Sequence, residues 1–317
     1  MYKLKEKPED FIVNEVISVP LVEKGEFSYY VLKKTDYATP IVIEKISKFL
    51  RVPMKRIGFA GTKDRRAITT QWISIEGAKG RIDEFKEKDI ELEFKGYGNK
   101  KIYLGMLEGN NFEIVVRNTT KKPKSIKEFV NYFDEQRFSM NNVEIGRAIV
   151  KKDFKKAVEI LMQSNGYYEK TLKDNYEKTH DAVNCLRKIP LHVLEFFTHA
   201  YQSEIWNKTA EEISKNIKEN IDVPIVGFGT EFDNKEIEEI TNRIFKEEGI
   251  TQRDFIIKSF PELSSEGNSR KLYSEVRDLQ IGELEDDELN PGMKKITLKF
   301  FLKKGNYATM AIKNMFN

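Results

Sequence analysis

The sequence has few of the residues that bind metals or form disulfide bonds. Among 317 residues there is one cysteine, Cys185, and there are three histidines, His180, His192 and His199. One thiol cannot build a disulfide framework within the chain, and neither paired cysteines nor a His-Glu-x-x-His spacing occurs. We therefore predict no metal site, and we interpret Cys185 as a buried small hydrophobic residue.

Long hydrophobic runs are also absent. Hydrophobic residues make up 39% of the chain and charged residues 33%, and no stretch approaches the ~20 apolar residues that cross a bilayer. The N-terminal residues MYKLKEKPEDF contain no apolar run before a small-residue cleavage site. We expect a soluble, cytoplasmic protein with no membrane partner.

A nucleotide-binding P-loop is missing as well. The stretch GFAGTK begins at Gly58, but a P-loop requires Ser or Thr after its lysine, and Lys63 is followed by Asp64. A nucleoside triphosphatase is therefore disfavoured.

Positive charge is unevenly distributed along the chain. The formal net charge is +3, yet residues 51–75 carry a net charge of +5, residues 95–124 carry another +5, and the remainder carries −7. If the two basic segments meet in the fold, they form a surface for a polyanion such as nucleic acid. If they do not meet, they are two separate solvated stretches, and composition alone does not decide between these alternatives.

The first third of the chain mixes strand and helix patterns. Runs rich in β-branched and aromatic residues, or with alternating apolar residues, predict strands at residues 11–16, 27–34, 71–77 and 112–118. Thr39 and Pro40 predict the start of a helix that is capped by the threonine hydroxyl, and Val52-Pro53 predicts its end.

The middle of the chain has a different residue pattern from the first third. From about residue 144 to 263 the pattern is mainly helical, and strand-like sequence returns at residues 293–316. We predict an α+β fold in which residues 1–143 and 264–317 form one domain with a mixed, largely antiparallel sheet flanked by helices. Residues 144–263 are predicted to form a mostly helical inserted domain.

Asp64 is the only carboxylate in the stretch GFAGTKDRRAITTQ. Its cationic neighbours favour the ionised form, which suits a nucleophile or a base rather than a proton donor. A turn aspartate in a surface ion pair is the simpler interpretation, and the local sequence alone favours it.

Several segments together resemble the TruD family of tRNA pseudouridine synthases. They are the GTKD loop and the segments LKEKPEDFIVNE, LGMLEGNNFEIVVRN, NYFDEQRF and AYQSEIWN, which begin at residues 4, 104, 131 and 200. The C-terminal KKGNYATMAIKNMF resembles the closing strand and helix of that family. The resemblance implies a pseudouridine-synthase-like catalytic sheet and an inserted TruD-type domain.

The resemblance also implies roles for individual residues. Asp64 is the implied catalytic nucleophile, and Lys5 either pairs with it or contacts a phosphate; a solvated terminal lysine is the alternative. Phe112 is the candidate to stack on a flipped-out base, although its alternation with Ile114 also fits a core phenylalanine. Asn110 either holds the loop or hydrogen-bonds the uracil edge.

The remaining candidates for substrate binding are basic or amide side chains near these motifs. They are Lys63, Arg65, Gln136 and Arg137, of which the last two are expected to support the site rather than perform chemistry.

The implied reaction converts a uridine of tRNA, at position thirteen, to pseudouridine, with other RNAs as further candidates. It breaks the N1 glycosidic bond and rejoins the base through C5 without net redox change, so we expect neither a metal nor a small-molecule cofactor. The alternative function is a catalytically silent RNA-binding or chaperone protein that keeps a basic cleft. A nucleoside hydrolase is disfavoured, because it would leave the two basic segments without a purpose.

Overall fold

The chain forms two compact units. The computed structural model describes residues 2–77, 81–138, 141–163 and 169–317. Unit 1 comprises Met1–Phe129 and Glu275–Asn317, and unit 2 comprises Val130–Ser274. Unit 2 is longer at both ends than the predicted insertion at 144–263, and the assignment of that range as an inserted domain stays a prediction.

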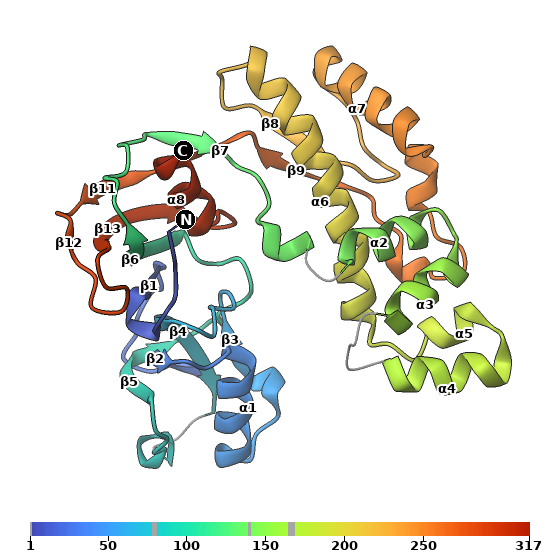
Figure 1. The fold of residues 1–317 in the computed structure, drawn as a ribbon. Helices are drawn as coiled ribbons and strands as arrows, with labels where there is room; N and C mark the ends of the chain where they lie inside the picture. The colour runs from blue at the N-terminus through green and yellow to red at the C-terminus, as the bar shows by residue number, and fades with distance from the viewer. Residues whose placement is uncertain (1, 78–80, 139–140, 164–168) are drawn as a thin grey trace. The chain divides into compact units, whose positions relative to one another are not determined.

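Unit 1 contains a nine-stranded sheet (Figure 1). Its strands are β1 (Phe11–Val16), β2 (Phe27–Thr35), β3 (Ile57–Phe59), β4 (Ile68–Glu76), β5 (Ile90–Gly98), β6 (Gly109–Thr119), β11 (Arg277–Ile281), β12 (Glu285–Asp286) and β13 (Lys294–Lys303). The order is β11-β13-β6-β1-β4-β2-β5, with β12 paired to β13 and β3 paired to β4. The pair β1 and β4 is parallel, and the other pairs of this sheet are antiparallel. The prediction of an α+β fold with a mixed, largely antiparallel sheet is confirmed.

Both ends of the chain build this sheet. β13 lies beside β6, and β6 lies beside β1, so a strand from the C-terminal part completes a sheet begun at the N-terminus. The strands predicted in the first third are present as β1, β2, β4 and β6. The sequence analysis missed β5, which is an edge strand, because exposed side chains at an edge allow a highly charged sequence.

Helix α1 (Thr39–Leu50) covers one face of the sheet, and α8 (Ala308–Phe316) closes the chain. Three short 3-10 helices, η1 (Pro8–Asp10), η2 (Met54–Arg56) and η3 (Arg81–Glu84), complete unit 1. The apolar side of α1 packs against buried side chains of β2, β3 and β4.

The predicted cap of α1 is wrong. The helix begins at Thr39 itself, Ala38 is the N-cap residue, and no side chain caps the helix. The hydroxyl of Thr39 instead donates to Gln71 Oε1 at 2.8 Å. The sequence predicted that the Thr39 hydroxyl caps the helix, but the hydroxyl bonds to a buried acceptor on β4 instead.

Unit 2 is mainly helical. Its elements are η4 (Glu135–Phe138), α2 (Asn142–Val150), α3 (Phe154–Gln163), α4 (Glu169–Thr179), α5 (Ala182–Leu186), α6 (Leu191–Asn216), β8 (Asp222–Ile225), α7 (Lys235–Glu248), η5 (Gln252–Phe255), η6 (Pro261–Leu263) and β9 (Asn268–Lys271). β8 pairs with β9. The strands β7 (Glu128–Val130) and β10 (Tyr273–Glu275) pair with each other at the two points where the chain passes between the units.

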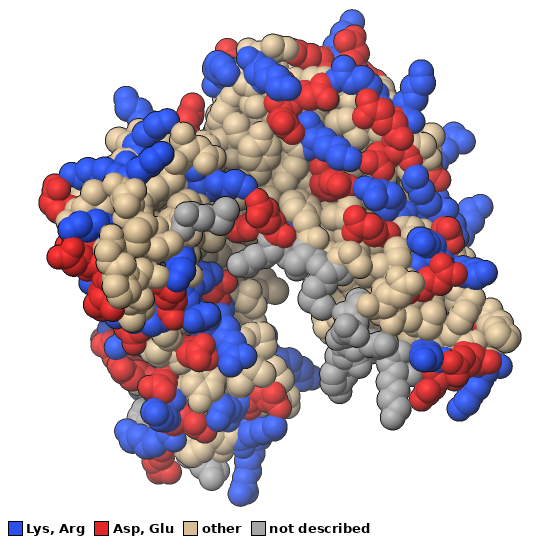
Figure 2. Space-filling view, in the orientation of Figure 1, with Lys and Arg blue, Asp and Glu red and all other residues tan. Residues whose placement is uncertain are grey.

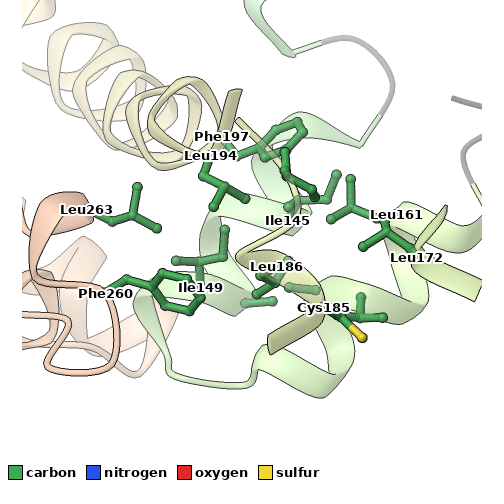
Figure 3. Close-up of a cluster of buried hydrophobic side chains, with 14 of the residues drawn as sticks. Ile145, Ile149, Leu161, Leu172, Cys185, Leu186, Leu194, Phe197, Phe260 and Leu263 are labelled. Carbon is green, nitrogen blue, oxygen red and sulfur yellow. The ribbon is translucent and has the colours of Figure 1, made fainter. Parts of the chain in front are cut away.

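An apolar cluster described in unit 2 joins residues of α2, α3, α4, α5, α6 and η6 (Figure 3). Ile149 and Leu186 are fully buried in it, and Leu161 and Leu194 lie beside them. Cys185 is fully buried in the same cluster, which confirms its interpretation as a small hydrophobic residue.

Candidate active site

The loop between β3 and β4, residues 60–67, carries Asp64 and is called the GTKD loop below. Gln71 Nε2 donates to Gly61 O at 3.0 Å and ties the loop to the following strand. Gly58 stands just before the loop, where a Cβ atom would lie 2.1 Å from Ile102 O. The glycine is required there because the backbone of another segment passes too close for any side chain.

Lys63 points from this loop into the sheet. Its Nζ pairs with the carboxylate of Glu15, and the two side chains are only 5% and 0% exposed. Glu15 Oε1 also accepts a hydrogen bond from Trp72 N at 3.0 Å, and Lys63 N donates to Thr39 Oγ1 at 3.0 Å. The buried pair anchors the loop to β1 and β4, and the predicted role of Lys63 in substrate binding stays a prediction.

The side chain of Asp64, unlike that of Lys63, is exposed. Its side chain is 48% exposed, and Oδ2 accepts a hydrogen bond from Lys5 Nζ at 2.8 Å. Of the two roles expected for Lys5, the structure therefore shows the pairing with Asp64. Lys5 has a left-handed backbone with φ 56°, and its ammonium lies 4.1 Å from the ring centroid of Phe11, a favourable cation–π contact.

Phe112 belongs to the same run of contacts. Its ring lies 6.2 Å from that of Phe11 and is stacked at 5.5 Å on Phe300, and the residue is 8% exposed. A chain of contacts thus leads from Asp64 through Lys5 and Phe11 to Phe112, although the ring of Phe112 has little exposed surface. Its packing is that of a core residue, and its predicted stacking on a base stays a prediction.

Asn110 precedes this ring by two residues on β6, on the same face of the sheet. It lies opposite Glu15 in the register of β1 and β6, so it shares the face that carries the Lys63–Glu15 pair. Its Oδ1 atom is buried and has no hydrogen-bond partner among the described residues. A buried acceptor needs a donor from water or from a ligand, so Asn110 is suited to receive a donor from a substrate.

The remaining predicted residues are Arg65 of unit 1 and Gln136 and Arg137 of unit 2. Arg65 is exposed, and its Nε lies 3.8 Å from Asp36 Oδ1. Arg137 and Gln136 belong to η4 of unit 2, where the guanidinium of Arg137 lies 5.0 Å from the ring centroid of Phe133. The side chain of Gln136 lies outside the described residues.

The two basic segments meet in unit 1. Lys101 Nζ, from residues 95–124, donates to the backbone carbonyl of Lys55, from residues 51–75. Figure 2 shows that lysine and arginine side chains on the visible face are interspersed with acidic ones. The segments are therefore adjacent, but on this face the positive charge does not form one unbroken patch.

Arg117, counted in the second basic segment, does not reach the surface. Its guanidinium is 2% exposed and pairs with Asp10 at 2.9 Å and Asp287 at 2.8 Å, and also with Glu288. The hydrogen bonds to Asp10 raise the pKa of Arg117 most, against the opposing effect of burial. This cation holds the N-terminal segment to the segment before β13 and cannot contribute to a surface for RNA.

Among the residues that the structure describes, no group of three or more His, Cys, Asp or Glu side chains is placed to hold a metal ion. No helix in the described ranges is both long enough and apolar enough to span a membrane.

Comparisons with known proteins place this α+β fold among the pseudouridine synthases, which are isomerases that act on RNA. A family model described as tRNA pseudouridine synthase D (TruD) matches residues 2–170 and 208–315. The chain belongs to the TruD family.

Individual relatives agree over nearly the whole chain. A protein of Methanocaldococcus jannaschii named "Probable tRNA pseudouridine synthase D 2" is 32% identical, covering 99% of this chain and 91% of the relative. The "tRNA pseudouridine synthase D" of Aquifex aeolicus is 29% identical, covering 99% and 98%. The crystal structure of a Methanosarcina mazei protein, titled "Putative tRNA pseudouridine synthase D (TruD)", superimposes with a TM-score of 0.74 at 29% identity, covering 98% of this chain and 92% of that one.

Sequence reasoning missed Lys34, which is fully buried beneath Asp64 and donates from Nζ to the backbone carbonyl of Asp64 at 2.9 Å. The signal was available, because Tyr30, Leu32 and Lys34 alternate on one face of β2 and the first two are core residues. It also missed Glu15, whose burial depends on its partner from the GTKD loop.

Proposed function

We propose that this chain isomerises uridine in tRNA to pseudouridine, and that Asp64 is the group that attacks the ribose or removes a ribose proton. The observation that carries the proposal is the placement of Asp64. It is half exposed, held by Lys5 on one side, and carried on a loop whose adjacent lysine is buried against Glu15.

The Lys5–Asp64 pair is suited to a reaction in which the carboxylate changes partner. The ammonium group stabilises the negative charge of Asp64 while the site is empty. Exposed ion pairs contribute only ~0–1 kcal/mol, so little free energy is needed to release Asp64 to the ribose. Lys5 can then turn its charge toward a phosphate of the RNA.

The reaction needs a carboxylate and a recognition group for the base. The N1–C1′ bond breaks, the uracil turns and a C5–C1′ bond forms. The proton on C5 leaves to water and N1 takes up a proton from water, so the product is an isomer of uridine. In this proposal the unpartnered Oδ1 of Asn110 accepts a hydrogen bond from a uracil N–H group. The sequence-based expectations of position thirteen, of additional RNA substrates, of a reaction without cofactor and of a cytoplasmic location remain predictions.

Tritium release tests the activity. Incubation of the chain with tRNA that carries tritium at C5 of uridine should release one tritium for each modified site, and EDTA should leave the rate unchanged. A silent RNA-binding protein would retain the tRNA without releasing label. Loss of release in EDTA that zinc reverses would contradict the metal-free reaction.

A further inference from the structure

The buried lysine on β2 is placed against the backbone of the proposed nucleophile. Lys34 is 0% exposed, and its Nζ donates to two backbone carbonyls, those of Asp64 at 2.9 Å and of Tyr37. Among the described residues it forms no ion pair with a carboxylate. Lys33 beside it points to solvent and pairs with Glu91.

Burial of the Lys34 ammonium costs free energy and does not by itself stabilise the fold. A core residue at position 34, next to Tyr30 and Leu32, would normally be apolar. Burial lowers the pKa of the Lys34 ammonium from 10.5 to about 8, with Asp64 raising it and Lys63 lowering it. A pKa below the ordinary value means that burying the ammonium costs free energy at pH 7. The two hydrogen bonds of Lys34 Nζ are therefore better explained by the positioning of the GTKD loop than by the stability of the fold.

We propose that Lys34 is a positioning residue, whose ammonium group fixes the backbone carbonyl of Asp64 and so sets the direction in which the Asp64 carboxylate faces the substrate. The proposal rests on the assignment of Asp64 as the nucleophile. Other bonds hold neighbouring residues of the loop: Gln71 Nε2 donates to Gly61 O, Lys63 N donates to Thr39 Oγ1, and Asp36 N donates to Ala67 O at 3.1 Å. Lys34 is the side chain that holds the backbone of Asp64 itself.

The test compares Lys34→Met with Lys33→Met. Methionine keeps the length and the apolar stem but cannot donate to the carbonyls. Lys34→Met should lower kcat about 100-fold with KM for tRNA within about twofold, because a small displacement of a reacting group costs that much. Lys33→Met should leave both constants within about twofold of the parent, since its pair with Glu91 is exposed.

Amide hydrogen exchange separates a failure of this proposal from a failure of the proposed function. In Lys34→Met, exchange in residues 60–67 should rise while exchange in β1 and β6 stays at the parent rate, because one segment is released and the sheet is intact. Unchanged exchange in 60–67 would overturn the positioning role whatever happens to kcat. Raised exchange with the parent kcat would also overturn it. A fully active Asp64→Asn variant would instead remove the nucleophile assignment.

The pH profile gives a readout that a merely structural lysine would not move. The charged groups that face the Lys34 ammonium are Asp64 and Lys63, both from the GTKD loop. The parent kcat should fall as the pH rises through about 8, since a neutral amine donates weaker hydrogen bonds than an ammonium. Lys34→Met should lack this fall, and a fall of equal size in both proteins would contradict the proposal.

Discussion

The two compact units bury different kinds of side chain. Among the described residues, the charged side chains in the buried class, Asp10, Lys34, Lys63, Arg117 and Asp287, all belong to unit 1. The buried polar side chains described in unit 2 are neutral, and its apolar cluster is built mainly from aliphatic and aromatic residues of the helices α2 to α6.

Buried charge is expensive, so this difference shows what each unit is built to do. Replacing a buried ion pair by packed apolar residues is often neutral or stabilising, and a buried charge is therefore weak evidence for stability. In unit 1, two of these charges, Lys34 and Lys63, contact the GTKD loop or belong to it. The unit that carries Asp64 holds costly charges that fix the loop, whereas unit 2 depends on apolar packing.

The largest expected effect is chemical and confined to unit 1. Asp64→Asn should lower turnover more than about a thousandfold, a barrier increase above ~4 kcal/mol, because the amide lacks the nucleophilic charge. The free energy of unfolding should change by only ~1 kcal/mol, since the Asp64 side chain is 48% exposed. Single-turnover kinetics and urea unfolding measure the two quantities.

Asp36→Asn is the matched control for Asp64→Asn. Asp36 is also an exposed aspartate in unit 1, and asparagine tolerates its left-handed backbone with φ 57°. Its turnover should stay within about twofold of the parent. A thousandfold loss in this control would show that surface charge, rather than the nucleophile, limits the reaction.

The second prediction sharpens the contrast between buried and exposed charge. Glu15→Gln leaves Lys63 buried without its counter-charge and should lower the free energy of unfolding by ~3–5 kcal/mol. Glu204→Gln in unit 2 breaks a partly exposed pair with Arg147 and should cost less than ~1 kcal/mol. Urea unfolding of both variants checks this, and equal losses would break the comparison.

The third prediction concerns the apolar core of unit 2. Leu186→Ala should lower the free energy of unfolding by ~2–5 kcal/mol, because Leu186 is 0% exposed and its loss leaves a cavity. Leu191→Ala, at an exposed position in the same unit, should cost less than ~0.5 kcal/mol. Similar losses in the two variants, measured by urea unfolding, would show that the cluster is loosely packed.

The same contrast explains what the sequence could predict. Local patterns placed four strands well: β-branched and aromatic content placed β1 and β2, and period-2 alternation placed β4 and β6. Helix α1 was also predicted over its observed range between Thr39 and the Val52-Pro53 stop, but its cap was not. The Thr39 hydroxyl went to Gln71, a partner more than thirty residues away that no local rule supplies.

Buried charges were the hardest feature to predict. Arg117 was counted as surface charge, because its partners Asp10 and Asp287 lie far from it in sequence. Lys34 was passed over because two adjacent lysines are typical of a solvated strand end. For the site, the pairing of Lys5 with Asp64 was among the stated alternatives. That Lys63 is buried while the adjacent Asp64 is exposed could be seen only in the folded structure.

The smallest expected effect is the response to acid. Burial alone would raise the pKa of Asp287, but hydrogen bonds from the backbone N–H groups of Asn118 and Leu289, with those from Asn290 and Arg117, lower it from 3.8 to about 2. Because the folded pKa lies below the unfolded one, the stabilisation is fully present above about pH 4 and is lost as the pH falls from 3.8 through about 2. Unit 1 should therefore lose stability in this window.

The two tryptophans report this separately, since Trp72 belongs to β4 of unit 1 and Trp206 to α6 of unit 2. In a Trp206→Phe variant the remaining fluorescence follows unit 1, and in Trp72→Phe it follows unit 2. Acid titration should shift the Trp72 signal at a higher pH than the Trp206 signal. Asp287→Asn, added to the Trp206→Phe variant, should flatten the dependence of unit 1 stability on pH below 4, because the amide does not titrate. Two results would contradict this prediction: both signals shifting at one pH, or an unchanged pH dependence in Asp287→Asn. Either would show that the buried charges of unit 1 do not set its stability in acid, so that the two units do not differ in this respect.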